Sequence, residues 1–255
     1  MPNFDTYHIL LESGFANTQH RLLSVAFALG VYGPLIGGLV ATWMDGGRDG
    51  LLDLWRRIVK WRLSGRWYLN ALGIVFLLAA LPTILFGLIG GFSPSRLSLG
   101  YVLVLTLVQV LRSGLGEEPG WRGYLLPRAK ARFEGEKHIW VLGLIWSAWH
   151  FPIVIFRTLS AMPDVPLPQM VITVLVSLAG NVMSLIGMTY IYVWLYNRTE
   201  SVFLAIVFHA LSNVFPFWLF SFLAAPASAG LAAGLLPWLV VLFLRWRLGR
   251  DRFPG

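Results

Sequence analysis

The chain has 255 residues, of which 57% are hydrophobic and 13% are charged, and its formal net charge is +8. A soluble domain is about one-quarter charged, so this composition excludes an ordinary soluble protein and indicates a membrane protein. The absence of cysteine excludes disulfides, thiolate nucleophiles and Cys-ligated metal centres. In a membrane protein the positive charge favours an anionic lipid surface, and no nucleic-acid partner is expected.

Several apolar windows are long enough to cross about 30 Å of hydrocarbon as helices. In chain order they cover residues 22–44, 67–92, 97–115, 139–156, 170–194, 202–223 and 230–244. The sequence therefore predicts an all-α polytopic transmembrane bundle of about seven spans. Residues 1–21 lack the features of a removable signal peptide and are expected to form an interfacial segment. Residues 22–244 are expected to form one transmembrane domain, and residues 245–255 a basic cytoplasmic tail.

Lysine and arginine are distributed unevenly over the loops expected between these windows. Six fall in residues 45–66, six in 112–138, one in 195–201 and four after residue 244, whereas Arg21, Arg96 and Arg157 fall on the opposite side. The positive-inside rule then predicts an outside N-terminus and a cytoplasmic C-terminus, in a plasma membrane of bacterial type.

Small residues recur along one face of the fifth window, at Ser177, Gly180, Ser184 and Gly187. Such a stripe lets another helix approach closely. We interpret it as a packing surface.

Ionisable groups inside a membrane are costly, and those that occur usually face the protein interior and serve a function. Here they are His150 in the fourth window, His209 with the amide Asn213 in the sixth, and Glu117 with Glu118 at the cytoplasmic end of the third. The helical rise places His150 about 16 Å and His209 about 10 Å from the cytoplasmic helix ends. Each residue alone could be structural, but their convergence on one leaflet favours a shared site.

The two glutamates lie in the run GLGEEPGWRGY, residues 114–124. Pro119 suits the first turn of a helix, so a new helical segment is expected here after a glycine-loosened break. Adjacent helical residues point about 100° apart, so the two carboxylates are not expected to face one site. Glu118 precedes Arg122 by four residues, which favours an ion pair and leaves Glu117 as the free carboxylate.

Three motifs thus occur in order: Glu117-Glu118-x-x-x-Arg122, Trp146-x-x-x-His150 and His209-x-x-x-Asn213. Over roughly residues 100–215 the chain resembles the intramembrane proteases that group type II CAAX prenyl endopeptidases with bacteriocin-processing and bacteriocin-immunity proteins. Trp146 stands where that family more usually has Phe. Members often have eight spans, so an eighth here would be a partial helix in the N-terminal segment.

The resemblance implies an intramembrane endopeptidase that acts on a membrane-associated or lipid-modified protein or peptide. It implies that Glu117 is the general base, that His150 orients and polarises the attacking water, and that His209 and Asn213 bind the oxyanion. It also implies that Glu118 and Arg122 support the catalytic residues.

Zinc is the competing chemistry. Two histidines and a carboxylate suffice for a catalytic zinc with an open position, so Glu117, His150 and His209 would be its ligands. We favour a metal-free site, because an asparagine four residues after a histidine resembles an oxyanion donor more than a zinc ligand.

A non-catalytic membrane protein, such as an immunity factor that binds a partner or a transporter, is the competing functional class. Proton relays use further charges along a path, and the predicted outer leaflet holds none. The expected partners are therefore membrane lipid and a protein or peptide substrate that enters from the membrane or the cytoplasmic side.

Overall fold

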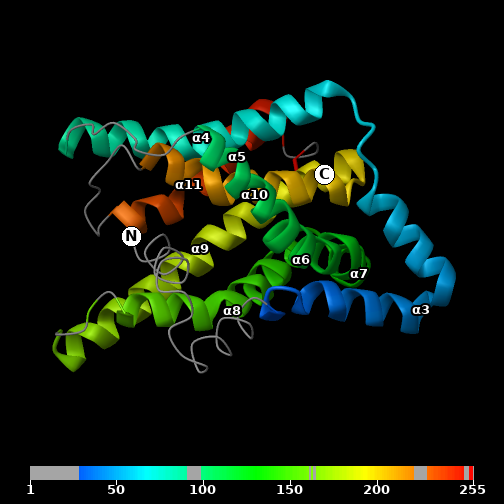
Figure 1. Ribbon diagram of the computed structural model, residues 1–255, viewed down its shortest axis with the longest axis horizontal. Coiled ribbons are helices and arrows are strands. Elements are labelled where there is room, and N and C mark those ends of the chain that lie inside the picture. Colours follow the sequence, from blue (N-terminus) through cyan, green and yellow to red (C-terminus); the bar gives the residue numbers. More distant parts are fainter. Residues whose placement is uncertain are drawn as a thin grey trace.

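The computed structural model describes residues 29–90, 99–160, 162, 165–220, 229–249 and 253–254. Within these ranges the chain is helical apart from short connections, which confirms the all-α prediction (Figure 1). The interfacial segment expected over residues 1–21 lies outside the described residues.

Helix α3 (Gly33–Ile58) starts inside the first predicted window and bends at Gly47. Gly47 has φ 55° and ψ −140°, a conformation that residues with a side chain rarely adopt. After the bend the helix continues through Arg48, Arg56 and Arg57. A loop was expected after residue 44, and this expectation is wrong for residues 45–58, which are helical apart from the bend. The bend at Gly47 redirects the helix, so the charged segment that follows remains helical.

Residues 99–132 form one helical run in which α-helical and π-helical turns alternate. The segments are α5 (Leu99–Gln109), the π-helix η1 (Val110–Gly114), α6 (Leu115–Glu118), the π-helix η2 (Pro119–Leu125) and α7 (Leu126–Arg132). The break expected before Pro119 is absent from this run, and Pro119 instead begins η2. Most of the loop expected over residues 112–138 is thus helical, and the glutamates lie between two π-helical turns, which are frequent at functional sites.

Glycines let this run pack closely against its neighbours. A Cβ on Gly120 would lie 2.1 Å from the carbonyl oxygen of Pro34 in α3. A Cβ on Gly114 would lie 2.8 Å from the carbonyl oxygen of Ile206 in α10 (Val202–Phe220). The segment that carries the glutamates is therefore held between α3 and α10.

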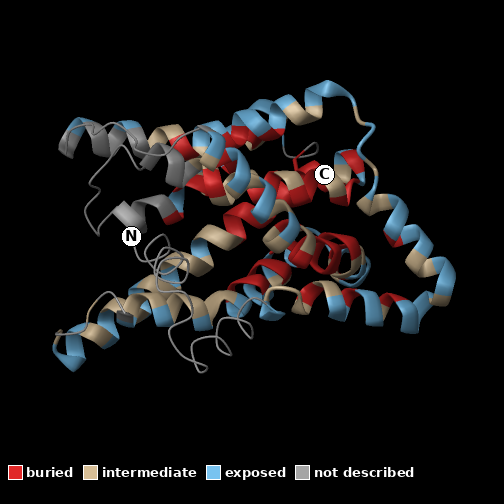
Figure 2. Ribbon diagram, viewed as in Figure 1, coloured by how far each residue is buried: buried red, intermediate tan, exposed pale blue. Residues whose placement is uncertain are grey.

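The core surrounds the C-terminal half of α9 (Leu167–Thr199). Residues 186–196 are all buried, as Figure 2 shows for the end of α9 beside the C-terminus. A helix that is apolar on every side requires neighbours all round. Those neighbours are α8 (Lys137–Ser160), α4 (Gly65–Gly90), α10 and α11 (Ala229–Leu248).

Two of the four small residues in the stripe on α9, Gly180 and Gly187, pack against α11, as expected for a packing surface. A Cβ on Gly234 would lie 3.0 Å from the carbonyl oxygen of Gly180, and a Cβ on Gly187 would lie 2.8 Å from Cβ of Pro237.

Two helices among the described residues are long and apolar enough to cross a membrane. They are Lys137–Leu159, with a mean hydropathy of 1.8, and Leu167–Thr199, with 2.0. Shorter apolar helices cover Gly65–Leu81 and Val202–Phe215. Large apolar side chains are also exposed on several helices, as on a surface that meets lipid. Examples are Leu69, Phe76, Leu103, Leu144, Ile172 and Leu242.

The segment predicted as a basic tail is partly built into the fold. Arg245 lies in the last turn of α11 and forms an ion pair with Glu136. Phe253 is fully buried and its ring lies against Tyr190 and Trp194 of α9. These two residues are therefore docked against the bundle.

Candidate active site

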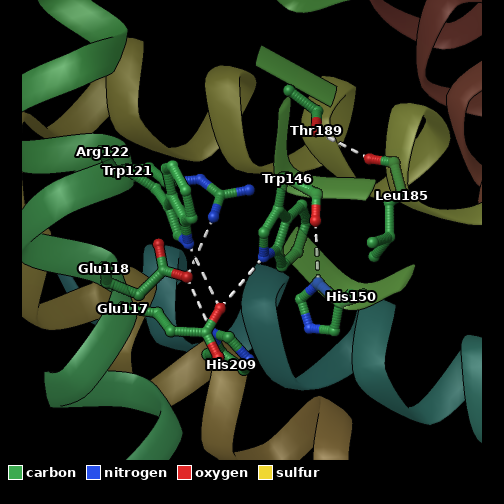
Figure 3. Close-up of polar contacts among 9 residues, drawn as sticks. All are labelled: Glu117, Glu118, Trp121, Arg122, Trp146, His150, Leu185, Thr189 and His209. Carbon is green, nitrogen blue, oxygen red and sulfur yellow. Dashed lines mark hydrogen bonds and ion pairs between the residues drawn. The ribbon is translucent and has the colours of Figure 1, made fainter. Parts of the chain in front are cut away.

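Three helices bring Glu117, Glu118, His150 and His209 into one region (Figure 3). Glu117 and Glu118 come from α6, His150 from α8 and His209 from α10. The close-up shows the Glu117 carboxylate joined to the indoles of Trp121 and Trp146, and the Glu118 carboxylate joined to Arg122 and the ring of His209.

Glu117 is only 5% exposed and is held by two tryptophan side chains. Its Oε2 accepts hydrogen bonds from the indole N–H of Trp121, at 3.2 Å, and of Trp146, at 3.1 Å. Within the described residues Glu117 forms no ion pair, as predicted for the free carboxylate.

Glu118 forms the ion pair predicted from its spacing to Arg122. Its Oε1 accepts hydrogen bonds from Arg122 Nη1, at 3.0 Å, and from His209 Nδ1, at 2.7 Å. The expectation that only Glu117 would face the imidazoles is therefore wrong for His209, which contacts Glu118. The 100° separation assumed a regular α-helix, whereas α6 lies between wider π-helical turns and both carboxylates are buried.

Arg122 is fully buried, and aromatic rings stabilise its charge together with Glu118. The guanidinium carbon lies 4.1 Å from the ring centroid of Trp146 and 3.8 Å from that of Tyr192. A desolvated cation–π contact is worth about 2 kcal/mol. The positive charge is thus compensated by one carboxylate and two ring faces.

Hydrogen bonds assign the protons on the two imidazoles. His150 Nδ1 lies 2.8 Å from the carbonyl oxygen of Trp146, which only accepts, so Nδ1–H donates and Nε2 of the neutral ring accepts. His209 Nδ1 likewise donates to the carboxylate of Glu118. His209 Nε2 can therefore donate only in the imidazolium form, for which Glu118 is the counter-charge.

Asn213 lies one turn after His209 on α10 and is half-buried. Both residues lie on the same helix, and their four-residue spacing puts the two positions on one face. In the described part of the chain no hydrogen bond joins the Asn213 side chain to Glu117 or Glu118.

Residues 98–215 match the family model of Rce1-like type II CAAX prenyl endopeptidases. All three motifs lie within these limits. Over these residues the chain is similar to the Rce1-like family. That family is membrane-embedded, and both candidate spans of the described residues fall inside the matched region.

A curated relative, CAAX prenyl protease 2 from Methanococcus maripaludis, is 36% identical to the chain over 146 residues. The match covers 55% of this chain and 51% of the relative. The chain therefore spans about half the length of the curated relative that it matches.

The zinc alternative predicted from the sequence would use the side chains of Glu117, His150 and His209 as ligands. Among the described residues, no three His, Cys, Asp or Glu side chains form a group that could hold a metal ion. Glu117 Oε2 is engaged by two indoles, and His209 Nδ1 by Glu118. These contacts leave Glu117 Oε1 and the Nε2 atoms of His150 and His209 as the atoms that a metal would bind, and as placed the three side chains do not group around one position.

Sequence reasoning missed the contacts of two aromatic residues in this Rce1-like region. Trp121 follows Glu117 by four residues, and this spacing was the available signal for their contact. Tyr192 lies in an uninterrupted apolar window, where no pattern separates a ring that faces Arg122 from one that faces the core.

Proposed function

We propose that the protein is an intramembrane endopeptidase that hydrolyses a peptide bond of a membrane-associated or lipid-modified protein or peptide. The observation that carries the proposal is the buried contact between Glu118 and His209, 91 residues apart, beside the indole-bound Glu117. Polar groups buried in a membrane bundle are costly and usually serve a function. The match of residues 98–215 to a family of endopeptidases supports the same proposal.

Glu117 is the general base of the proposed reaction. A water molecule hydrogen-bonded to Glu117 and to His150 Nε2 gives a proton to Glu117 as its oxygen bonds to the scissile carbonyl carbon. The carbonyl π electrons move onto the oxygen, which accepts hydrogen bonds from His209 Nε2–H and the Asn213 amide. When the intermediate collapses, the C–N bond breaks and Glu117 returns the proton to the leaving amine.

Glu118 and Arg122 support this chemistry without touching the substrate. Glu118 supplies the negative charge that lets His209 carry two protons and donate through Nε2. Arg122 holds Glu118 in place at 3.0 Å and is itself fixed between two rings.

The proposal includes a membrane placement. The site lies in the cytoplasmic half of a seven-span bundle in a plasma membrane of bacterial type, with the N-terminus outside and the C-terminus in the cytoplasm. The distribution of lysine and arginine supports this orientation. The proposed partners are membrane lipid and a substrate that enters from the membrane or the cytoplasmic side.

The name of the curated relative suggests the substrate class. A CAAX sequence is a C-terminal cysteine, two aliphatic residues and a variable residue, and its cysteine is prenylated. We therefore propose a prenylated CAAX sequence as the substrate.

Mass spectrometry of a peptide digest tests the activity. Wild-type protein and Glu117→Gln, both in liposomes, are incubated with a farnesylated CAAX peptide and its unprenylated counterpart. We expect wild type to cleave only the farnesylated peptide and Glu117→Gln to cleave neither. Equal cleavage of both peptides would contradict prenyl recognition, and full cleavage by a well-folded Glu117→Gln would contradict the role of Glu117.

A metal-free site is part of the proposal. We expect purified protein to hold less than one equivalent of zinc, measured by plasma mass spectrometry, and to keep its activity in chelator. One tightly held equivalent of zinc, lost together with activity and restored with it, would make Glu117, His150 and His209 metal ligands instead.

A further inference from the structure

We propose that Trp121 and Trp146 are positioning residues that fix Glu117 through its Oε2 and leave Oε1 as the oxygen that takes up the proton. This inference rests on the proposed role of Glu117 as the base. Both indole N–H groups reach the same carboxylate oxygen, at 3.2 Å and 3.1 Å. Both tryptophans are buried, at 8% and 3% exposure.

The two donors come from different helices, which makes their convergence informative. Trp121 belongs to η2, one turn beyond Glu117, and Trp146 belongs to α8. An indole N–H only donates, so each tryptophan can bind an oxygen with free lone pairs but can accept no proton. Hydrogen bonds to an ionised acceptor are stronger than neutral ones, and a general base starts the reaction ionised. The pair thus suits a carboxylate that is held by one oxygen and reacts through the other.

Trp146 contacts the other groups of the site as well as Glu117. Its ring faces Arg122 at 4.1 Å, and its centroid lies 5.8 Å from that of His150 and 5.9 Å from that of His209. Its carbonyl oxygen accepts the hydrogen bond from His150 Nδ1. One residue therefore sets the position of the base relative to both imidazoles. A phenylalanine at this position would have no N–H, so the hydrogen bond to Glu117 depends on the indole of Trp146.

Trp149 provides a matched control on the same helix. It lies three residues after Trp146 and its ring meets Trp121 edge-on at 6.2 Å. Within the described residues it makes no hydrogen bond to Glu117. Trp149→Phe removes an indole from the same aromatic layer without removing a donor to Glu117.

The test replaces the N–H of Trp146 and keeps the shape of the ring. Genetic incorporation of 3-benzothienylalanine at position 146 exchanges N–H for sulfur, and Trp146→Phe serves as the second variant. The infrared carboxylate stretch of Glu117 is isolated as the difference between each protein and the same protein carrying Glu117→Gln. Turnover is measured on the farnesylated CAAX peptide.

We expect the carboxylate band to shift in both Trp146 variants and to stay in place in Trp149→Phe. We expect kcat to fall about 10-fold to 100-fold in the Trp146 variants, with KM within about twofold, because a misplaced base weakens the chemical step more than binding. An unshifted band in the benzothienyl variant, or a shifted band with wild-type kcat, would overturn the inference. Failure of the wild type to cleave would contradict the proposed function, and the band would then still decide whether the indoles hold Glu117.

Discussion

Glu117 and Glu118 are neighbours in the sequence but have different surroundings in the site. Glu117 accepts hydrogen bonds from two neutral indoles, whereas Glu118 lies against a guanidinium and an imidazole. The two indoles donate to Oε2 alone, so Glu117 keeps Oε1 as the oxygen that can receive a proton from water. A carboxylate engaged by cations is better suited to holding them in place, so the different surroundings support different roles.

Substitution separates these roles. Glu117→Gln keeps an acceptor for the indoles, so we expect a folded protein without peptidase activity. Glu118→Gln leaves Arg122 buried without its counter-charge, which costs about 3–5 kcal/mol, and we expect a lower unfolding temperature as well as lower turnover. Thermal unfolding in detergent and peptide cleavage measure the two effects. The opposite result would be an inactive Glu118→Gln protein that is as stable as wild type, together with a fully active Glu117→Gln protein. Glu118 would then be the base and Glu117 the supporting residue.

Asn213 is the mildest of the proposed catalytic residues. Removing one oxyanion donor typically lowers turnover by about 100-fold to 1,000-fold, so we expect Asn213→Ala to retain measurable activity. KM should change little, because the donor acts mainly on the tetrahedral intermediate. Steady-state kinetics on the farnesylated peptide measure both quantities. Wild-type kcat in Asn213→Ala would remove this residue from the oxyanion site.

At the residue scale, local contacts could be predicted from the sequence and distant ones could not. The Glu118–Arg122 ion pair follows from a four-residue spacing on one helix. The contact of His209 with Glu118 joins positions 91 residues apart, and it depends on how α10 packs on the π-helical run. Periodicity carries no information about that register, because it is set by glycines such as Gly114 against Ile206.

At the scale of elements, hydropathy found apolar helices well and charged helices badly. The windows at residues 139–156 and 170–194 lie within α8 and α9. Residues 45–58 were expected as a loop because of their charges, yet they are helical. A helix with charges on one side is stable when its other side is buried, as Leu54 is. Hydropathy windows average over both sides and miss this pattern.

Glycine packing gives a prediction for the glutamate segment. A methyl group at Gly120 would meet the backbone of Pro34 at 2.1 Å, and backbone cannot move aside as a flexible side chain can. We expect Gly120→Ala to destabilise the protein by about 1–3 kcal/mol and to lower activity through displacement of the glutamates. Gly37→Ala is the control, because its Cβ would have no atom within 4 Å. Equal unfolding temperatures for the two variants would contradict this packing role.

At the scale of the whole molecule, orientation follows from charge. The proposed topology puts residues 53, 137 and 252 on the cytoplasmic side and residue 163 outside. The absence of native cysteine makes labelling with an impermeant maleimide direct. Of single cysteines at Asp53, Lys137, Pro163 and Arg252, we expect only the one at Pro163 to react in intact cells. External labelling at Lys137 would reverse the orientation and the side from which the site opens.

The bend of α3 makes one helix touch the glutamate segment twice. Before the bend, Gly38 packs on Gly120, where a Cβ would lie 2.8 Å from Cα. After it, Arg57 donates a hydrogen bond to the Gly123 carbonyl oxygen at 2.7 Å. The two contacts lie on opposite sides of the bend at Gly47, so α3 has two arms that each hold the glutamate segment. Trp43, on the first arm, is exposed. Because both arms hold this segment, a change of the angle at Gly47 would move one contact relative to the other.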